Sequence, residues 1–136
     1  MDYPLEQALK VLHNTKLPEN ERVSAVKSLM HHQTPEVVDI LIQTLEDDDQ
    51  GVRWAAADVL ATFGEMAYPS LLHALVKPNV DILLRQGAAH ILHQNASERI
   101  RKETGALQKA LKAPGTSVYA MEEANKLLIQ YINKPY

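Results

Sequence analysis

Two sets of polar residues recur at matching positions along the chain and could contact a partner. Arginines stand at the first position, 31 and 32 residues apart, as Arg22, Arg53 and Arg85. The second position holds Lys27, Asp58, His90 and, in a less regular fourth copy, Lys126. A mixed, mildly basic strip of this kind can grip an acidic peptide or a phosphate, because each guanidinium group offers two parallel hydrogen bonds. The alternative is a solvated helix face whose ion pairs contribute less than about 1 kcal/mol each.

Trp54 is the only tryptophan, and it lies four residues before Asp58, on the same face of a helix. The apolar side of that helix holds Val52, Ala56 and Leu60, so Trp54 is expected to point the other way. An indole ring there could anchor a partner, as aromatic hot spots do. Alternatively, the ring packs on a neighbouring helix, against Val23 or Gln86.

Chemistry that needs a metal or a nucleophile finds little support. The chain contains no cysteine, which excludes disulfides, thiolate metal sites and cysteine nucleophiles. His90 and His93 are spaced i, i+3 and could converge on a metal with His73, although surface histidines are the simpler interpretation. The aspartates at 47–49 lack the EF-hand spacing, and no glycine-rich phosphate loop is present. We therefore expect no catalytic residue, no metal and no cofactor.

The bulk properties limit the class of protein. A chain of 136 residues can form one domain with its own core. Its net charge of −3 argues against a dedicated nucleic-acid binder, which usually has a basic face. No apolar run of about 18 residues predicts a membrane span. The N-terminal residues 1–4 lack the basic and apolar regions of a signal peptide, so a cytoplasmic location is expected.

The candidate positions recur because the sequence around them repeats. Residues 52–60 recur in degraded form at 84–92 and at 21–29. A fixed period of this length indicates a solenoid of stacked units, in which each unit packs only on its neighbours. We predict an all-α, right-handed α–α superhelix of four helical hairpins, hence eight helices.

Each unit is expected to contain a first helix, A, and a second helix, B. The A helices carry leucines and other apolar residues at i, i+3 and i+4, on one stripe. The B helices carry an alanine four residues before a leucine: Ala25 and Leu29, Ala56 and Leu60, Ala88 and Leu92, Ala124 and Leu128. The last leucine comes 36 residues after the third, so an insertion is expected, most naturally around residues 95–99. The expected units cover approximately residues 3–33, 34–64, 65–95 and 98–134.

Turn and packing signals agree with this division. Thr34 is a suitable N-cap before a helix, and Gly64 can adopt the left-handed conformation that ends one. Small residues precede the B-helix alanines at Ser24, Ala55 and Gly87, which predicts close approach of the helices. Glu123 stands at the equivalent place in the last unit, as expected if that B helix caps the stack.

The residues Asp47, Val52, Arg53, Ala55, Ala56 and Leu60 resemble the HEAT-repeat pattern, particularly the short bacterial form known from phycobilisome lyases. The resemblance is most specific in the second unit. It implies that the A helices line a convex side and the B helices a concave side. It also implies a structural role for Asp47 and Arg53, a bond in which the turn aspartate holds the arginine of a stacked unit. Asn79 and Lys16 replace the aspartate before Arg85 and Arg22, which interrupts a continuous row.

We predict a non-catalytic scaffold or adaptor that binds another protein or a peptide on the concave B-helix surface. An acidic partner would suit the basic strip. The contact candidates are Arg22, Arg53, Trp54, Asp58, Arg85 and His90. The resemblance to lyases implies an alternative, a helper subunit of a bilin or cofactor lyase. Trp54, Asp58 and Arg85 also resemble the trio of HEAT-like alkylpurine DNA glycosylases, which makes a glycosylase or nucleic-acid binder the second alternative.

Overall fold

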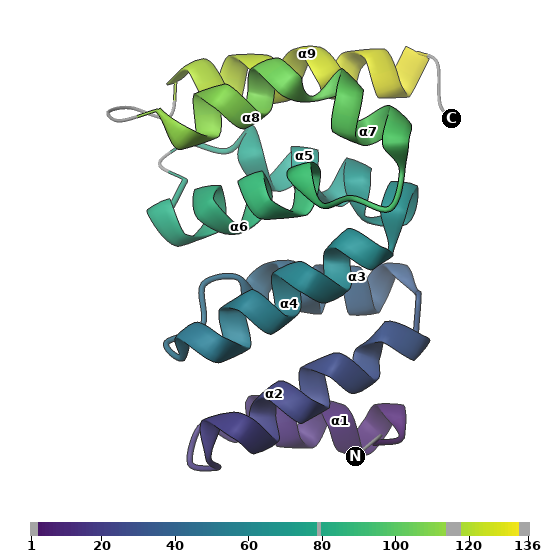
Figure 1. Cartoon of the computed structure of the whole chain (residues 1–136), viewed down its shortest axis with the longest axis vertical. Helices are drawn as coiled ribbons and strands as arrows, with labels where there is room; N and C mark the ends of the chain where they lie inside the picture. The colour runs from purple at the N-terminus through teal and green to yellow at the C-terminus, as the bar shows by residue number, and fades with distance from the viewer. Residues whose placement is uncertain (1–2, 79, 114–117, 134–136) are drawn as a thin grey trace.

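The computed structural model describes residues 3–78, 80–113 and 118–133 as a stack of helices, with no strand among these residues (Figure 1). The α-helices in these ranges are α1 (Leu5–His13), α2 (Glu19–Ser28), α3 (Pro35–Thr44), α4 (Gln50–Thr62), α5 (Tyr68–Leu75), α6 (Ile82–His93), α7 (Glu98–Glu103), α8 (Gly105–Lys112) and α9 (Val118–Asn133). Short 3₁₀ helices follow α2 and α4, at Leu29–His31 and Gly64–Ala67. None of the described helices is both long and apolar enough to cross a membrane.

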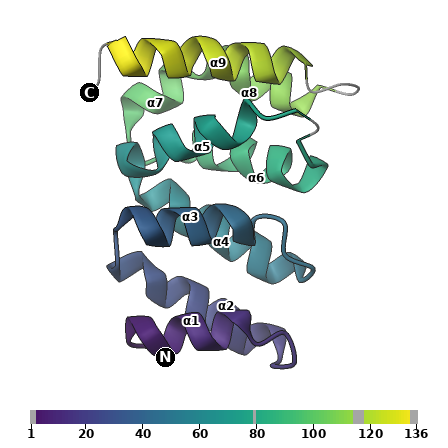
Figure 2. The same ribbon diagram turned by 180° about the vertical axis from the view of Figure 1, so that it is seen from behind.

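The helices form two layers. The B layer consists of α2, α4, α6 and α8, each of which contacts the next, and it faces the viewer in Figure 1. The A layer consists of α1, α3, α5 and α9, seen from behind in Figure 2. The predicted all-α superhelical fold is therefore confirmed, because the apolar stripes of neighbouring units cover one another.

Two local signals have the expected effect on helix ends. The Thr34 hydroxyl accepts a hydrogen bond of 3.3 Å from the Val37 N–H at the start of α3. Gly64 has φ of +61°, a left-handed conformation that most residues adopt only with strain, and α4 ends just before it. Both positions were predicted from the sequence.

The last hairpin differs from the prediction in two respects. An additional helix, α7, follows α6, so the described residues form nine α-helices where eight were expected. The layers of the last pair are also exchanged: α8 contacts α6 in the B layer, and α9 contacts α5 in the A layer. The stripe around Leu107 and Leu111, expected in an A helix, thus belongs to the B layer. The stripe of Ala124 and Leu128, expected in a B helix, belongs to the A layer.

The insertion at residues 95–99 explains this exchange. The Ala96 N–H donates to the carbonyl of Ala61 at 2.9 Å, which holds the connection against the end of α4 in the B layer. The helix α7 begins there, with Ser97 as its N-cap and a fully buried Ile100. Because α7 and α8 are separated only by Thr104, the chain continues beside α6 before it can return to the A layer.

The last hairpin also runs in the opposite direction to its neighbours. Arg85, near the start of α6, bonds to carbonyls at the end of α8. The ring of Tyr68, at the start of α5, packs edge-on against Tyr131 near the end of α9, with centroids 6.1 Å apart. The Tyr68 hydroxyl also donates to Glu103 Oε2 at 3.3 Å, and burial together with this carboxylate raises the pKa of Tyr68, so the donor keeps its proton.

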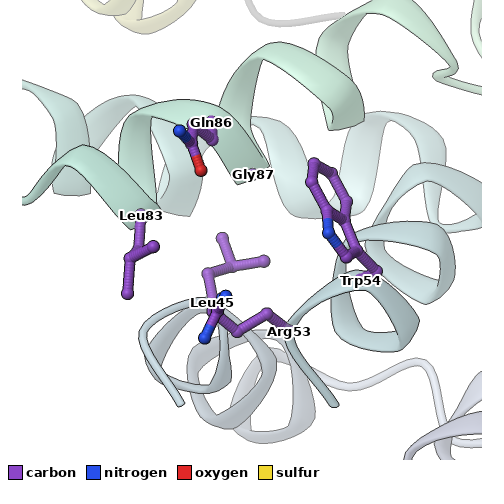
Figure 3. Close-up of a pocket in the computed structure, with 6 residues that line it drawn as sticks. All are labelled: Leu45, Arg53, Trp54, Leu83, Gln86 and Gly87. Atoms are coloured by element: carbon purple, nitrogen blue, oxygen red, sulfur yellow. The ribbon is translucent and has the colours of Figure 1, made fainter. Parts of the chain in front are cut away.

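Close packing explains the glycine within α6. A Cβ atom on Gly87 would lie 3.0 Å from Cδ2 and 3.4 Å from Cδ1 of Leu45, a residue that is itself buried (Figure 3). Gly87 thus has the packing role that the sequence predicted, because the absence of a side chain leaves room for Leu45 to pack against α6.

We expect Gly87→Val to lower the free energy of unfolding by about 2 kcal/mol, because a branched side chain must displace Leu45 from a packed site. Urea denaturation measures the change. The matched control is Gly105→Ala at the start of α8, where an added Cβ meets nothing within 4 Å. That variant should be no less stable than the parent, and equal losses in the two variants would contradict the packing role.

Candidate functional site

Three of the predicted contact residues meet on the B layer. Trp54 and Asp58 come from successive turns of α4, and His90 comes from α6. The rings of Trp54 and His90 pack edge-on, with centroids 5.3 Å apart and planes at 72°. His90 Nε2 lies 2.7 Å from Asp58 Oδ1, so the histidine joins the two helices. The i, i+4 spacing of Trp54 and Asp58 predicted their common face.

Trp54 is partly packed on a neighbouring helix and partly exposed to solvent. Its inner edge packs toward α6, where it lines a cavity of about 10 Å³ with Gln86 and Gly87 (Figure 3). Its outer part stays accessible, with 39% of the residue exposed. Val23, the other suggested neighbour, lies on α2 and does not line this cavity.

A groove of about 520 Å³ opens beside Trp54 on the same layer. It extends over α4, α6 and the end of α8, and its lining residues are Trp54, Ile82, Gln86, Ala89, His90, His93, Leu111, Lys112 and Ala113. Ile82 is 60% exposed there and offers apolar surface to a partner. A groove of this size falls in the range of ligand and peptide sites.

A second, smaller hollow of about 230 Å³ lies between α2 and α4 on this layer. Asp58 and Lys27 line it together with Met30, which is 39% exposed. Because Asp58 also binds His90, the Asp58–His90 pair lies between the hollow and the groove. Sequence reasoning missed Met30, Ile82 and Lys112, since they match no repeated polar column.

Arg22, expected on the binding surface, is buried and only 3% exposed. Its guanidinium forms a bidentate bond to Asp47, from Nη2 to Oδ1 at 2.7 Å and from Nη1 to Oδ2 at 3.0 Å. Nη1 also donates to Asp49 at 2.8 Å, and Nε donates to the Leu12 carbonyl at 2.9 Å. Arg22 thus links the first two units, and this is the tie to a stacked unit that the HEAT resemblance implied for Asp47.

Electrostatics strengthen this link. Burial alone would raise the pKa of Asp47, but the hydrogen bonds from Arg22 and from the Asp49 N–H outweigh it and hold that pKa below its ordinary value. The hydrogen bonds that Arg22 donates to Asp47 likewise raise the pKa of Arg22, against the opposing effect of burial. Both groups therefore stay charged in the folded protein.

The other two arginines also serve the fold. Arg85 is 5% exposed, and its Nη2 donates to the carbonyls of Ala110 and Ala113 at 3.3 and 3.2 Å. Arg53 is half-buried and donates to the carbonyls of Asp47 and Asp48. The expected surface strip of arginines is thus corrected, because Arg22 and Arg85 are buried. Arg53 bonds to the turn before its own helix, not to an aspartate side chain of a stacked unit as the resemblance implied. Arg85 consequently does not join Trp54 and Asp58 in a surface trio.

The remaining sequence candidates are dispersed. Lys126 lies on α9 in the A layer, where it pairs with Glu123 at 3.2 Å, so it is not part of the B-layer column. His90 and His93 both line the groove, whereas His73 lies on α5 in the other layer. In the part of the chain that the structure describes, no group of three histidine or acidic side chains could hold a metal.

Stacked helical hairpins with a groove along one layer define a helical-repeat protein. A family model described as HEAT repeats matches residues 5–93, about two thirds of the chain, and the chain belongs to this family. HEAT repeats generally mediate protein–protein interactions. The match ends at the last residue of α6, directly before the reversed hairpin. No curated protein and no solved structure matches the chain.

We expect Asp47→Asn to lower the free energy of unfolding by about 2 to 3 kcal/mol near neutral pH, because the buried guanidinium of Arg22 then loses the partly buried carboxylate that it binds. A carboxylate with a depressed folded pKa stabilises above its ordinary pKa, and this contribution is lost as pH falls through the folded value. The difference between parent and variant should therefore persist down to about pH 5 and shrink below about pH 4.

Urea unfolding at a series of pH values measures this difference. Asp48→Asn is the control, because it removes the same charge from an exposed neighbour of Asp47. The structural role of the Arg22–Asp47 pair is refuted if the two variants lose equal stability. It is also refuted if the stability lost in Asp47→Asn stays the same as the pH is lowered.

Proposed function

We propose that this chain is a non-catalytic protein-interaction module that binds a segment of a partner protein in the groove on the B layer. The observation that carries the proposal is an open groove of about 520 Å³ beside the exposed indole of Trp54. The general role of HEAT repeats in protein–protein interaction supports it. The groove also lies on the B layer, and the HEAT resemblance implies that B helices line the concave side.

The way Trp54 is held favours binding. Its ring packs against His90, which is itself fixed by Asp58, and both helices belong to the packed stack. A partly exposed aromatic ring in a fixed orientation loses little conformational entropy when a partner covers it. Trp54 and Ile82 would supply most of the apolar contact, whereas His90 and Asp58 would provide polar contacts at the edge.

Neither the DNA glycosylase function nor the helper role in a bilin lyase has support among the described residues. The buried guanidinium of Arg85 binds the end of α8, so the trio that resembled a DNA glycosylase is not assembled. A helper role in bilin attachment followed only from the family resemblance.

We expect peptides selected from a random display library on the folded chain to bind in this groove. Trp54→Ala should weaken them at least about tenfold, as loss of an aromatic hot spot does. Ile82→Ala should weaken them by a smaller factor, because it removes less apolar contact. Titration calorimetry measures each affinity, and circular dichroism verifies that the variants are folded.

Ile132→Ala is the matched control, since Ile132 is an isoleucine of similar exposure, 65%, on α9 in the other layer. It should leave the affinities unchanged. Failure to select any peptide, or selected peptides that bind the Trp54→Ala variant as well as the parent, would refute the proposed function.

A further inference from the structure

We propose that the segment bound in this groove is acidic, with an apolar residue placed beside Trp54 and a carboxylate nearby that pairs with the ammonium group of Lys112. This inference rests on the proposed function, because it names the chemistry of the partner at the same groove. It follows from the charges that surround the groove and from the helix that the reversed hairpin brings there.

The groove is lined mainly by apolar side chains and has one ammonium group, that of Lys112. Its apolar contacts come from Trp54, Ile82 and Leu111, and its ionisable side chains are His90, His93 and Lys112. No acidic residue is among the residues that line it. The acidic side chains beside this lining are already engaged: Asp58 binds His90 Nε2 at 2.7 Å, and Asp81, the residue before Ile82, accepts a hydrogen bond of 2.7 Å from the Leu83 N–H. An incoming carboxylate therefore meets the ammonium of Lys112, which is exposed.

The reversed hairpin determines which charged side chain reaches the groove. Residues 98–112, which form α7 and α8, contain five basic residues and two acidic ones, a surplus of three positive charges in a chain whose net charge is −3. Lys109 is also exposed and lies one turn before Lys112. The regular order would instead have placed α9 here, which carries Glu122 and Glu123 with Lys126. Exchange of the layers thus puts Lys112 at the edge of an apolar groove.

This combination is suited to a segment that has both an apolar anchor and acidic residues. The apolar contact supplies affinity, whereas charge complementarity selects the partner and speeds association. Lys112 is exposed, so its contribution should weaken as salt rises. A basic segment would meet Lys112 with like charge.

Three pools of capped peptides test the inference on the full chain. All have the same variable apolar anchor, and their flanking positions are filled with Asp and Glu, with Ser and Gln, or with Lys and Arg. Fluorescence anisotropy of labelled peptides measures the affinities. The acidic pool should bind at least about tenfold more tightly than the basic pool at low salt, and this advantage should narrow at high salt.

Charge reversal at the groove identifies the cation involved. Lys112→Glu should weaken binding of the acidic pool about tenfold, since repulsion replaces attraction, and should improve binding of the basic pool. Lys16→Glu is the control, because it makes the same change in net charge at an exposed position between α1 and α2.

The outcomes separate the two proposals. If neutral peptides bind as tightly as acidic ones, or if Lys112→Glu binds the acidic pool as well as Lys16→Glu does, the acidic partner is refuted. The proposed binding of a partner in the groove is still supported in that case, provided that binding requires Trp54. If no pool binds, or if binding is independent of Trp54, the proposed function fails together with this inference.

Discussion

Each hairpin of this protein has an apolar stripe that only a neighbouring hairpin can cover, and the whole structure depends on this requirement. The alanines Ala25, Ala56 and Ala88 are fully buried in the B layer, where the small side chains let successive helices approach closely. Leu45 fits against the bare backbone of Gly87 for the same reason. Stability is therefore distributed along the seams between units, as expected of a solenoid. The outer faces of the helices are then available for binding.

The repeating part of the fold was predictable from the sequence, because amphipathic spacing directly reports which side of a helix is covered. The last hairpin was not, since an apolar stripe does not specify which layer covers it. The residues around Leu107 and Leu111, and those around Ala124 and Leu128, make equally good stripes for either position. What decides between them is the anchored connection from Ala96 to Ala61 and the extra helix α7. The insertion itself was recognisable from the altered spacing.

The candidate site was predictable only in part, and the reason lies in the length of the side chains. Helical spacing locates a Cα atom on one face, which sufficed for Trp54 and Asp58. An arginine extends several bonds further and can reach back into a seam, as Arg22 does to Asp47. The aspartates at 47–49, in the unit after that of Arg22, were the sequence signal that this arginine could bind between units. The exposed Ile82 and Lys112 gave no comparable signal, because their importance arises only when α6 and α8 lie together.

The buried arginines also show why the reversed hairpin is compatible with the stack. Arg22 finds its acceptors in the aspartates of the next unit, but Arg85 has no aspartate in the unit that follows it. A helix that ran parallel to α6 would turn its N–H groups toward this guanidinium. Because α8 runs the opposite way, it offers instead the carbonyls of Ala110 and Ala113, at the negative end of its dipole. The end of α8 that binds Arg85 inside the stack is also the end that carries Lys112 to the groove. One helix end thus satisfies a buried cation on its inner side and presents an exposed cation on its outer side.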